Sequence, residues 1–204
     1  MELTTLRLRL RPFTPADGDE LFAIVGDQEA MEYSFPMTRE ESDAFLEKAL
    51  IQRRPPVGYA LEELGKPGLA GHVLFCPLEE PGVYELGWFL RRDLWGRGYA
   101  YEISQTLLEY AFGTLGLGRV EGETTDPHRA GRLLEKLGMA RQGEEQVTDC
   151  RGKPAALYRY AVTAEGWRAQ REDLTDEVRV AGRVSAEHAG GGEALAPRLE
   201  DVPL

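Results

Sequence analysis

Two glycines, Gly96 and Gly98, lie where an apolar segment is followed by a helical one, in LRRDLWGRGYAYEIS. The preceding run VYELGWFL, Val83–Leu90, is rich in the aromatic residues that favour strands. After the glycines, Ile103 and Leu107 recur at helical spacing. A strand that leads into a helix needs a tight turn, and glycine adopts backbone conformations that other residues avoid. The pair therefore indicates either a plain turn or a loop whose backbone a ligand approaches closely.

The N-terminal half of the sequence contains strand-like and helix-like patterns. LRLRLRPF, Leu6–Phe13, alternates apolar and basic residues, which predicts a strand with one buried face. A helix is expected after Thr14, because threonine caps helices and Pro15 suits the first helical position. Thr38 and Glu41 match a capping box and predict a second helix. GYALEEL and LAGHVLFCPL flank the turn sequence GKPG, which predicts an antiparallel hairpin.

The C-terminal half adds a strand, a helix, a strand and a tail. RVEGETT reads as a short strand, a helix is expected from Asp126 to Gly138, and ALYRYAVT is the last expected strand. The succession of elements predicts a mixed α/β domain over residues 1–168. Beyond it, small residues such as AGGGEALAP predict an acidic, low-complexity and flexible tail over residues 169–204, with EVRVAGRV as an alternative strand.

Composition and charge argue against several classes of function. The chain of 204 residues has a formal net charge of −11, which argues against a nucleic-acid partner and mildly favours cationic ligands. Because no apolar run could span a bilayer and the N-terminus is unlike a signal peptide, we expect a cytoplasmic protein without a membrane partner. Cys76 and Cys150 form neither a disulfide framework nor a metal set, and with the histidines scattered along the chain no metal is expected.

The segments YELGWFLRRDLWGRGYAYE and RLLEKLGMARQG together resemble the GNAT superfamily of acetyltransferases. Within it, the sequence most resembles the branch that includes the ribosomal-protein alanine N-acetyltransferases. The resemblance covers Leu6 to Arg168. It implies a mixed, mostly antiparallel central sheet with splayed parallel strands and flanking helices. The implied cosubstrate is acetyl-CoA, without a metal, and the implied partner is an amine acceptor; a homodimer is left open.

The resemblance also implies where acetyl-CoA binds. In the family, two neighbouring strands splay apart and the pantetheine arm lies between them, against backbone that corresponds here to Trp88, Phe89, Leu90 and Arg91. The pyrophosphate lies on loop amides, which correspond here to Trp95, Gly96, Arg97, Gly98, Tyr99, Ala100 and Tyr101. The resemblance thus favours the second explanation of the glycines, in which CoA reaches the main chain.

The sequence departs from the family pattern at two positions. Counting back from Gly138, the asparagine that contacts the pantetheine arm in relatives is absent, and Pro127 to Ala130 occupy that region. Leu134 replaces a tyrosine that protonates the departing thiolate in many relatives. For Tyr99 and Tyr101, which follow the glycines, core packing is the favoured role.

Glu85 is the predicted catalytic base. An amine attacks a thioester only when it is neutral, so a group must accept a proton from the ammonium form. Glu85 matches the position often used as base in the family, and partial burial in the sheet would raise its pKa. The alternatives are a solvated glutamate or one paired with arginine. Phe35, in YSFPM, is expected to line the acceptor pocket, with ordinary core packing as the alternative.

The leading hypothesis is an acetyl-CoA-dependent N-acetyltransferase that acts on a protein N-terminus or a small amine. The altered asparagine and tyrosine positions keep a second hypothesis open, a module that binds an acyl-CoA without turnover. A third hypothesis is an interaction protein that uses its acidic tail. Glu85 separates the first two, because a binding module does not need a base.

Overall fold

The computed structural model describes residues 1–31, 36–149 and 152–172. Residues Met1–Gly166 form one compact unit, and a second unit begins at Trp167. The described part of the second unit, residues 167–172, belongs to a helix over 164–172. Residues 169–172, where the predicted tail begins, belong to this helix, whereas residues 173–204 of the tail, with the alternative strand EVRVAGRV, lie outside the described residues. Within the described ranges, no helix has the length and apolar character needed to cross a membrane.

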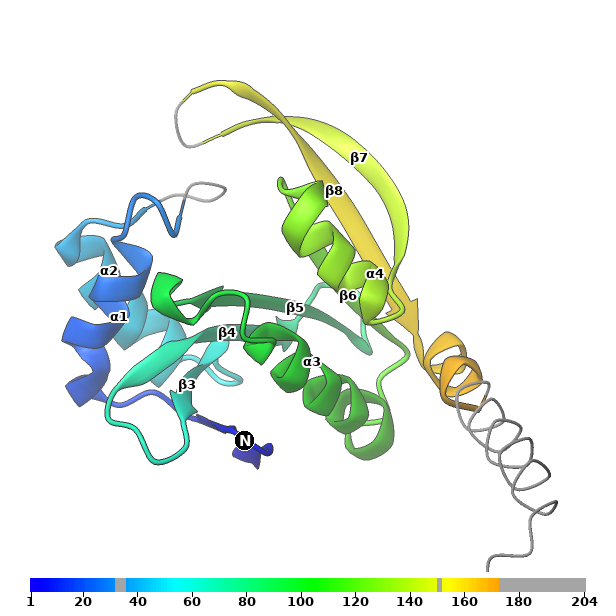
Figure 1. The fold of residues 1–204 in the computed structure, drawn as a ribbon, viewed down its shortest axis with the longest axis horizontal. Coiled ribbons are helices and arrows are strands. Elements are labelled where there is room, and N and C mark those ends of the chain that lie inside the picture. The colour runs from blue at the N-terminus through cyan, green and yellow to red at the C-terminus, as the bar shows by residue number, and fades with distance from the viewer. Residues whose placement is uncertain (32–35, 150–151, 173–204) are drawn as a thin grey trace, which may run out of the picture. The chain divides into compact units, whose positions relative to one another are not determined.

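The first unit contains the mixed α/β arrangement that the sequence predicts (Figure 1). Its strands are β1 (Leu3–Thr4), β2 (Leu8–Arg11), β3 (Gly58–Glu63), β4 (Leu69–Pro77), β5 (Val83–Leu90), β6 (Arg119–Thr124), β7 (Ala140–Thr148) and β8 (Pro154–Thr163). Its α-helices are α1 (Gly18–Val25), α2 (Arg39–Phe45), α3 (Tyr99–Glu109) and α4 (Arg132–Lys136). Short 3-10 turns lie at Pro15–Asp17 and Arg92–Leu94, and π-helical segments at Leu46–Gln52, Tyr110–Thr114 and Pro127–Gly131.

The eight strands form one sheet in the order β1-β2-β3-β4-β5-β6-β8-β7. Neighbouring strands are antiparallel except for β5 and β6, which are parallel. Parallel neighbours need a crossover connection, which α3 provides. The predicted mixed, mostly antiparallel sheet with a pair of parallel strands is therefore confirmed.

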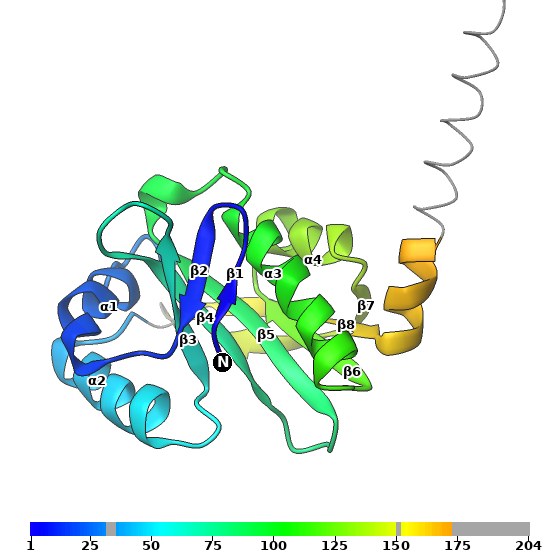
Figure 2. The same ribbon diagram turned by 90° about the horizontal axis from the view of Figure 1, so that it is seen from below.

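Helices cover both faces of the sheet (Figures 1 and 2). On one face, α1 and α2 bury a cluster that includes Leu21, Leu46 and the strand residues Ala60 and Cys76. Because side chains alternate along a strand, the neighbouring Leu61 faces the opposite side, where it is fully buried. That opposite face is covered by α3, whose apolar stripe includes the fully buried Ile103 and Leu107. The two cores fix the central strands on which the site is built.

Local capping signals explain where several helices begin. The Thr38 hydroxyl accepts a hydrogen bond from the Glu41 amide at 3.3 Å, and the Thr38 amide donates to Glu41 Oε2 at 2.7 Å, so the predicted capping box is present. Asp126 Oδ1 accepts from the amides of His128 and Arg129, each at 3.1 Å, and starts the segment that leads into α4. The helix expected directly after Thr14 instead begins with a 3-10 turn, and α1 starts at Gly18.

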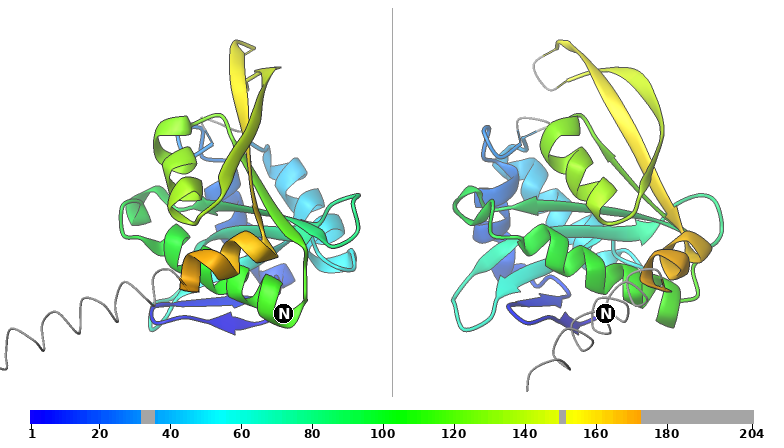
Figure 3. Two further views of the ribbon diagram at one scale, coloured as in Figure 1. Left: turned by 90° about the vertical axis from the view of Figure 1, so that its right-hand side faces the viewer. Right: turned by 45° about the vertical axis from the view of Figure 1, so that its right-hand side comes forward.

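Three strands differ from the sequence-based expectation. The strand predicted for Leu6–Phe13 is shorter, β2, and pairs with the additional β1. β7 was not expected, because ARQGEEQVT has no apolar alternation and nearly all of its side chains are exposed. Pairing with β8, not burial, defines β7 as a strand. Figure 3 shows β7 and β8 extending beyond the other strands as a twisted hairpin.

Candidate functional site

The parallel strands β5 and β6 separate partway along the sheet. Their pairing runs from Val83 and Arg119 to Glu85 and Glu121, whereas β5 continues to Leu90. On its other edge, β5 stays paired with β4 along its whole length, up to the contact of Leu90 with Gly71. From Leu86 onward, one edge of β5 therefore has no partner strand in the described part of the chain. Backbone hydrogen-bonding groups at such an edge are available to a ligand.

A cleft of about 640 Å³ lies at this divergence. It is lined by β5, the loop before α3, the first turn of α3, the end of β6, and α4. The predicted cosubstrate-binding residues that line it are Trp88, Phe89, Leu90, Trp95, Gly96, Gly98, Tyr99, Ala100 and Tyr101. Arg91 and Arg97 do not belong to the lining. Its volume lies in the usual range for small-molecule sites.

The loop before α3 combines unusual backbone conformation with free amides. Gly96 and Gly98 have φ values of 74° and 78°, in the left-handed region that favours glycine. The turn alone is therefore sufficient reason for both glycines. The amides of Tyr99, Ala100 and Tyr101 lie in the first turn of α3, where no preceding helix turn supplies a carbonyl acceptor. These residues line the cleft, so the positive end of the α3 helix dipole lies there.

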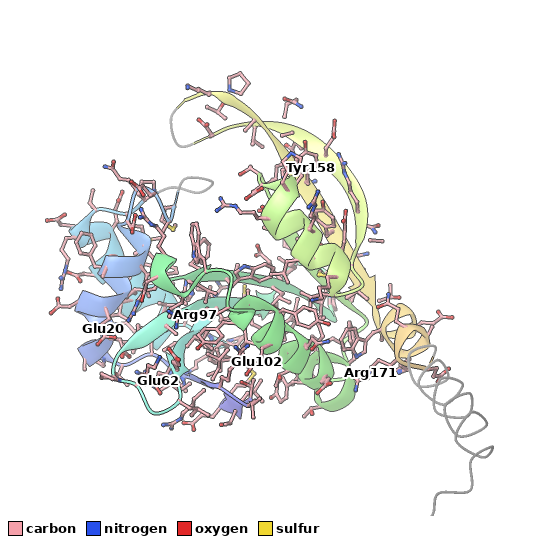
Figure 4. The ribbon with its side chains drawn as sticks, in the orientation of Figure 1. Glu20, Glu62, Arg97, Glu102, Tyr158 and Arg171 are labelled. Carbon is pink, nitrogen blue, oxygen red and sulfur yellow. The ribbon has the colours of Figure 1, made fainter. Side chains whose placement is uncertain are left out.

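The start of α3 is held rigidly by side chains. Trp95 Nε1 donates a hydrogen bond to the Leu90 carbonyl at 2.9 Å, which ties the loop to the end of β5. The buried Tyr99 donates to Glu63 Oε1 at 2.7 Å, so its hydroxyl has a structural role. Glu102, labelled with Arg97 in Figure 4, accepts from the Arg7 amide at 2.9 Å and from Arg7 Nε at 2.6 Å. The amides at the cleft are thereby pre-positioned.

Glu85 is half-buried in β5 and lines the cleft where the two strands begin to separate. Burial raises the pKa of Glu85, and the carboxylates of Glu123 and Glu121 raise it further. Among the described residues, Glu85 forms no ion pair with arginine or lysine, unlike the paired alternative considered from the sequence. A carboxylate with a raised pKa is a better proton acceptor than an ordinary one.

Three carboxylates gather on one face of the sheet at the cleft. Glu121 is the register partner of Glu85, and Glu123 follows on the same face because side chains alternate. Arg119 Nη2 lies 2.5 Å from Glu121 Oε1, so an ion pair neutralises Glu121. Glu123 lines the cleft itself. Glu123 was not among the site residues predicted from the sequence, although the alternation in RVEGETT places its side chain on the same face as that of Glu121.

The remaining predicted residues are distributed as follows. Phe35 lies outside the described residues. Arg91 pairs with Asp93 at 2.7 Å, so its guanidinium is directed to that carboxylate. Leu134 is buried and lines the cleft, where it offers no proton. The described residues contain no group of histidine, cysteine, aspartate and glutamate side chains suited to a metal ion.

Comparison with known proteins gives consistent matches. The family described as acetyltransferase (GNAT) domain matches residues 7–140. The uncharacterized N-acetyltransferase YnaD of Bacillus subtilis is 29% identical over 172 residues, which cover 82% of this chain and 99% of that protein. A GNAT-family acetyltransferase from Bacillus anthracis has a TM-score of 0.71 at 26% identity, over 81% of this chain and 99% of that chain.

One similar crystal structure contains ligands. The spermidine N-acetyltransferase of Vibrio cholerae, in complex with CoA and spermine, has a TM-score of 0.67 and covers 78% of this chain and 97% of its own. Its sequence identity is 18%, so the likeness extends to the fold alone.

Proposed function

Because this chain belongs to the acetyltransferase (GNAT) domain family, we propose that it transfers the acetyl group of acetyl-CoA to a primary amine, with Glu85 as the base. Family membership makes the chain an N-acetyltransferase. The observation that supports the proposed site most strongly is the position of Glu85, at the point where β5 loses its partner β6 and the cleft begins.

The residues of the cleft fit acetyl-CoA. The unpaired edge of β5 from Leu86 to Leu90 offers backbone groups to the amides of the pantetheine arm. The amides at the start of α3 suit the pyrophosphate, since helix N-termini bind anions through free N–H groups and the helix dipole. Acetyl-CoA supplies the activated acetyl group as a thioester. Backbone N–H groups near Gly87 to Phe89 are proposed to polarise its carbonyl.

Glu85 would accept the proton that an ammonium acceptor must lose before it can attack. Because burial raises it, the pKa of Glu85 lies closer to neutral pH than that of a solvent-exposed glutamate, which suits a general base. Leu134 cannot protonate the departing thiolate, so Glu85 should account for most of the catalytic effect that substitution of side chains can remove.

The carboxylates of the cleft favour an acceptor that arrives as a cation. Glu85 and Glu123 line the cleft, and neither forms an ion pair with a basic side chain of the described residues. An ammonium group approaching them would gain Coulombic attraction. Both proposed acceptor classes, a protein N-terminus and a small amine, satisfy this requirement. The proposed kinship with the ribosomal-protein alanine N-acetyltransferases favours the first class.

An acceptor panel tests the proposal. Purified protein is incubated with acetyl-CoA and peptides of varied first residue, polyamines or aminoglycosides, and released CoA is measured with a thiol reagent. We expect turnover with at least one cationic primary amine. Stabilisation of the fold by acetyl-CoA without turnover on any acceptor would instead support the alternative, a non-catalytic acyl-CoA-binding module. Full turnover after deletion of residues 173–204 would exclude the third hypothesis, in which the tail carries the function.

A further inference from the structure

Two cation–aromatic contacts join the two sides of the cleft, one from the π-helical segment Pro127–Gly131 to the loop before α3 and one from α4 to the first turn of α3. The Arg129 guanidinium carbon lies 5.0 Å from the ring centroid of Trp95. Lys136 Nζ lies 4.4 Å from the ring centroid of Tyr101. All four residues line the cleft. Both cations are therefore held opposite the free amides of α3, although they come from a different part of the chain.

A hydrogen bond holds the Tyr101 side chain, and the Lys136 ammonium rests on the Tyr101 ring. The Tyr101 hydroxyl accepts a hydrogen bond from Gln105 Nε2 at 2.7 Å, one helical turn further along α3. Lys136 is exposed at the end of α4 and forms no ion pair with a carboxylate in the described part of the chain. An ammonium on a partly exposed ring such as that of Tyr101 is weakly bound, and its long flexible stem allows it to move.

A phosphate at the cleft would be a stronger partner for Lys136 than the ring is. Hydrogen bonds between two ionised groups are shorter and stronger than neutral ones. The chain carries a formal net charge of −11, so a polyanionic ligand is repelled at long range and needs local cations at its site. The amides at the start of α3 provide one positive element there. Lys136, over the ring of Tyr101 in the first turn of α3, provides a second.

We propose that Lys136 is a specificity-determining residue that exchanges the Tyr101 ring for a phosphate of CoA when acetyl-CoA enters the cleft. The inference rests on the proposed function, and it concerns a residue that the family resemblance did not assign. The shared chemistry is a phosphate group, which belongs either to the pyrophosphate or to the 3′-phosphate. Recognition by Lys136 favours acetyl-CoA over thioesters that lack phosphate.

The test compares Lys136→Met with Lys48→Met, a matched control. Lys48 is an exposed lysine in the π-helical segment Leu46–Gln52 that does not line the cleft, so both variants lose the same charge. Affinities for acetyl-CoA, acetyl-3′-dephospho-CoA and S-acetylpantetheine are measured by calorimetry at two salt concentrations. Since Lys136 is exposed, both variants should fold, which circular dichroism checks.

We expect Lys136→Met to weaken acetyl-CoA binding about tenfold, the usual effect of one charge-assisted hydrogen bond, and to reduce its salt dependence. Binding of S-acetylpantetheine should be the same in Lys136→Met and wild type. If the loss disappears with acetyl-3′-dephospho-CoA, the partner is the 3′-phosphate; if it persists, the partner is the pyrophosphate.

Two results would overturn the inference. One is an affinity for acetyl-CoA equal to that of Lys48→Met, and the other is an equal loss for S-acetylpantetheine, which would make Lys136 a structural residue. Failure of the wild-type protein to bind acetyl-CoA would be a different result, since it would contradict the proposed function itself.

Discussion

Lowering the pH from 7.5 to 5 should destabilise the fold by about 2 kcal/mol through His72 alone. His72 lies in β4 and is 2% exposed. Its ring centroid is 5.7 Å from that of Phe13, 5.6 Å from that of Phe45 and 5.6 Å from that of Phe89. Among the described residues, no group forms a hydrogen bond with its Nε2. Burial lowers the pKa of His72 to about 4.

The magnitude follows from the difference between the folded and unfolded states. An imidazole in the unfolded chain has a pKa of about 6.5, so just below that pH the unfolded state binds a proton that the folded state does not bind. The contribution of neutral His72 to the stability of the fold is complete above the pKa of the imidazole in the unfolded chain, and it is lost as the pH falls toward 4. The full loss is about 3 kcal/mol, of which about 2 kcal/mol is reached at pH 5.

Urea unfolding at several pH values measures this contribution. His72→Leu removes the titrating ring. Between pH 7.5 and 5, the free energy of unfolding of wild type should therefore fall by about 2 kcal/mol more than that of His72→Leu. His128, which is exposed, provides the control His128→Leu, which should follow wild type. Equal pH dependence in His72→Leu and wild type would show that the buried His72 does not set the loss of stability at low pH.

Two further substitutions test the loop and the cap. Gly98→Asn introduces a residue that tolerates positive φ but adds a side chain at the cleft, so the rise in melting temperature with acetyl-CoA should be lost. The control is Gly65→Asn, which should retain the rise, because Gly65 also has a positive φ, 76°, and no atom lies within 4 Å of an added Cβ. Asp126→Ala removes the acceptor for the amides of His128 and Arg129 and should lower the free energy of unfolding by about 1 kcal/mol in urea titrations. An unchanged free energy of unfolding would contradict the role of Asp126 as a cap.

Elements with a strong local pattern were predictable from the sequence. The apolar and aromatic run Val83–Leu90 matches β5 residue for residue, because its buried positions are apolar and it stays paired with β4 almost to its end. The capping box at Thr38 was also recognisable, because it depends on side chains only three residues apart.

Features that depend on contacts between distant segments were not predictable. β7 carries polar residues on both faces, so only its pairing with β8 makes it a strand. Glu123 and Lys136 come from β6 and α4, and the sequence does not reveal that they line the cleft that contains Glu85. The positive φ of Gly96 and Gly98 shows that the loop conformation itself demands glycine, whichever ligand binds there.

The most direct test of the account is the turnover of Glu85→Gln over a range of pH, with an amine that wild type acetylates. Glutamine preserves shape but cannot accept the proton, so kcat should fall by about 10²-fold or more near neutral pH, and the deficit should shrink as rising pH supplies neutral amine. Stabilisation by acetyl-CoA should persist, and Glu79→Gln, an exposed glutamate outside the cleft, should keep wild-type kcat. Wild-type turnover of Glu85→Gln at neutral pH would contradict the account, because solvent or another group would then remove the proton.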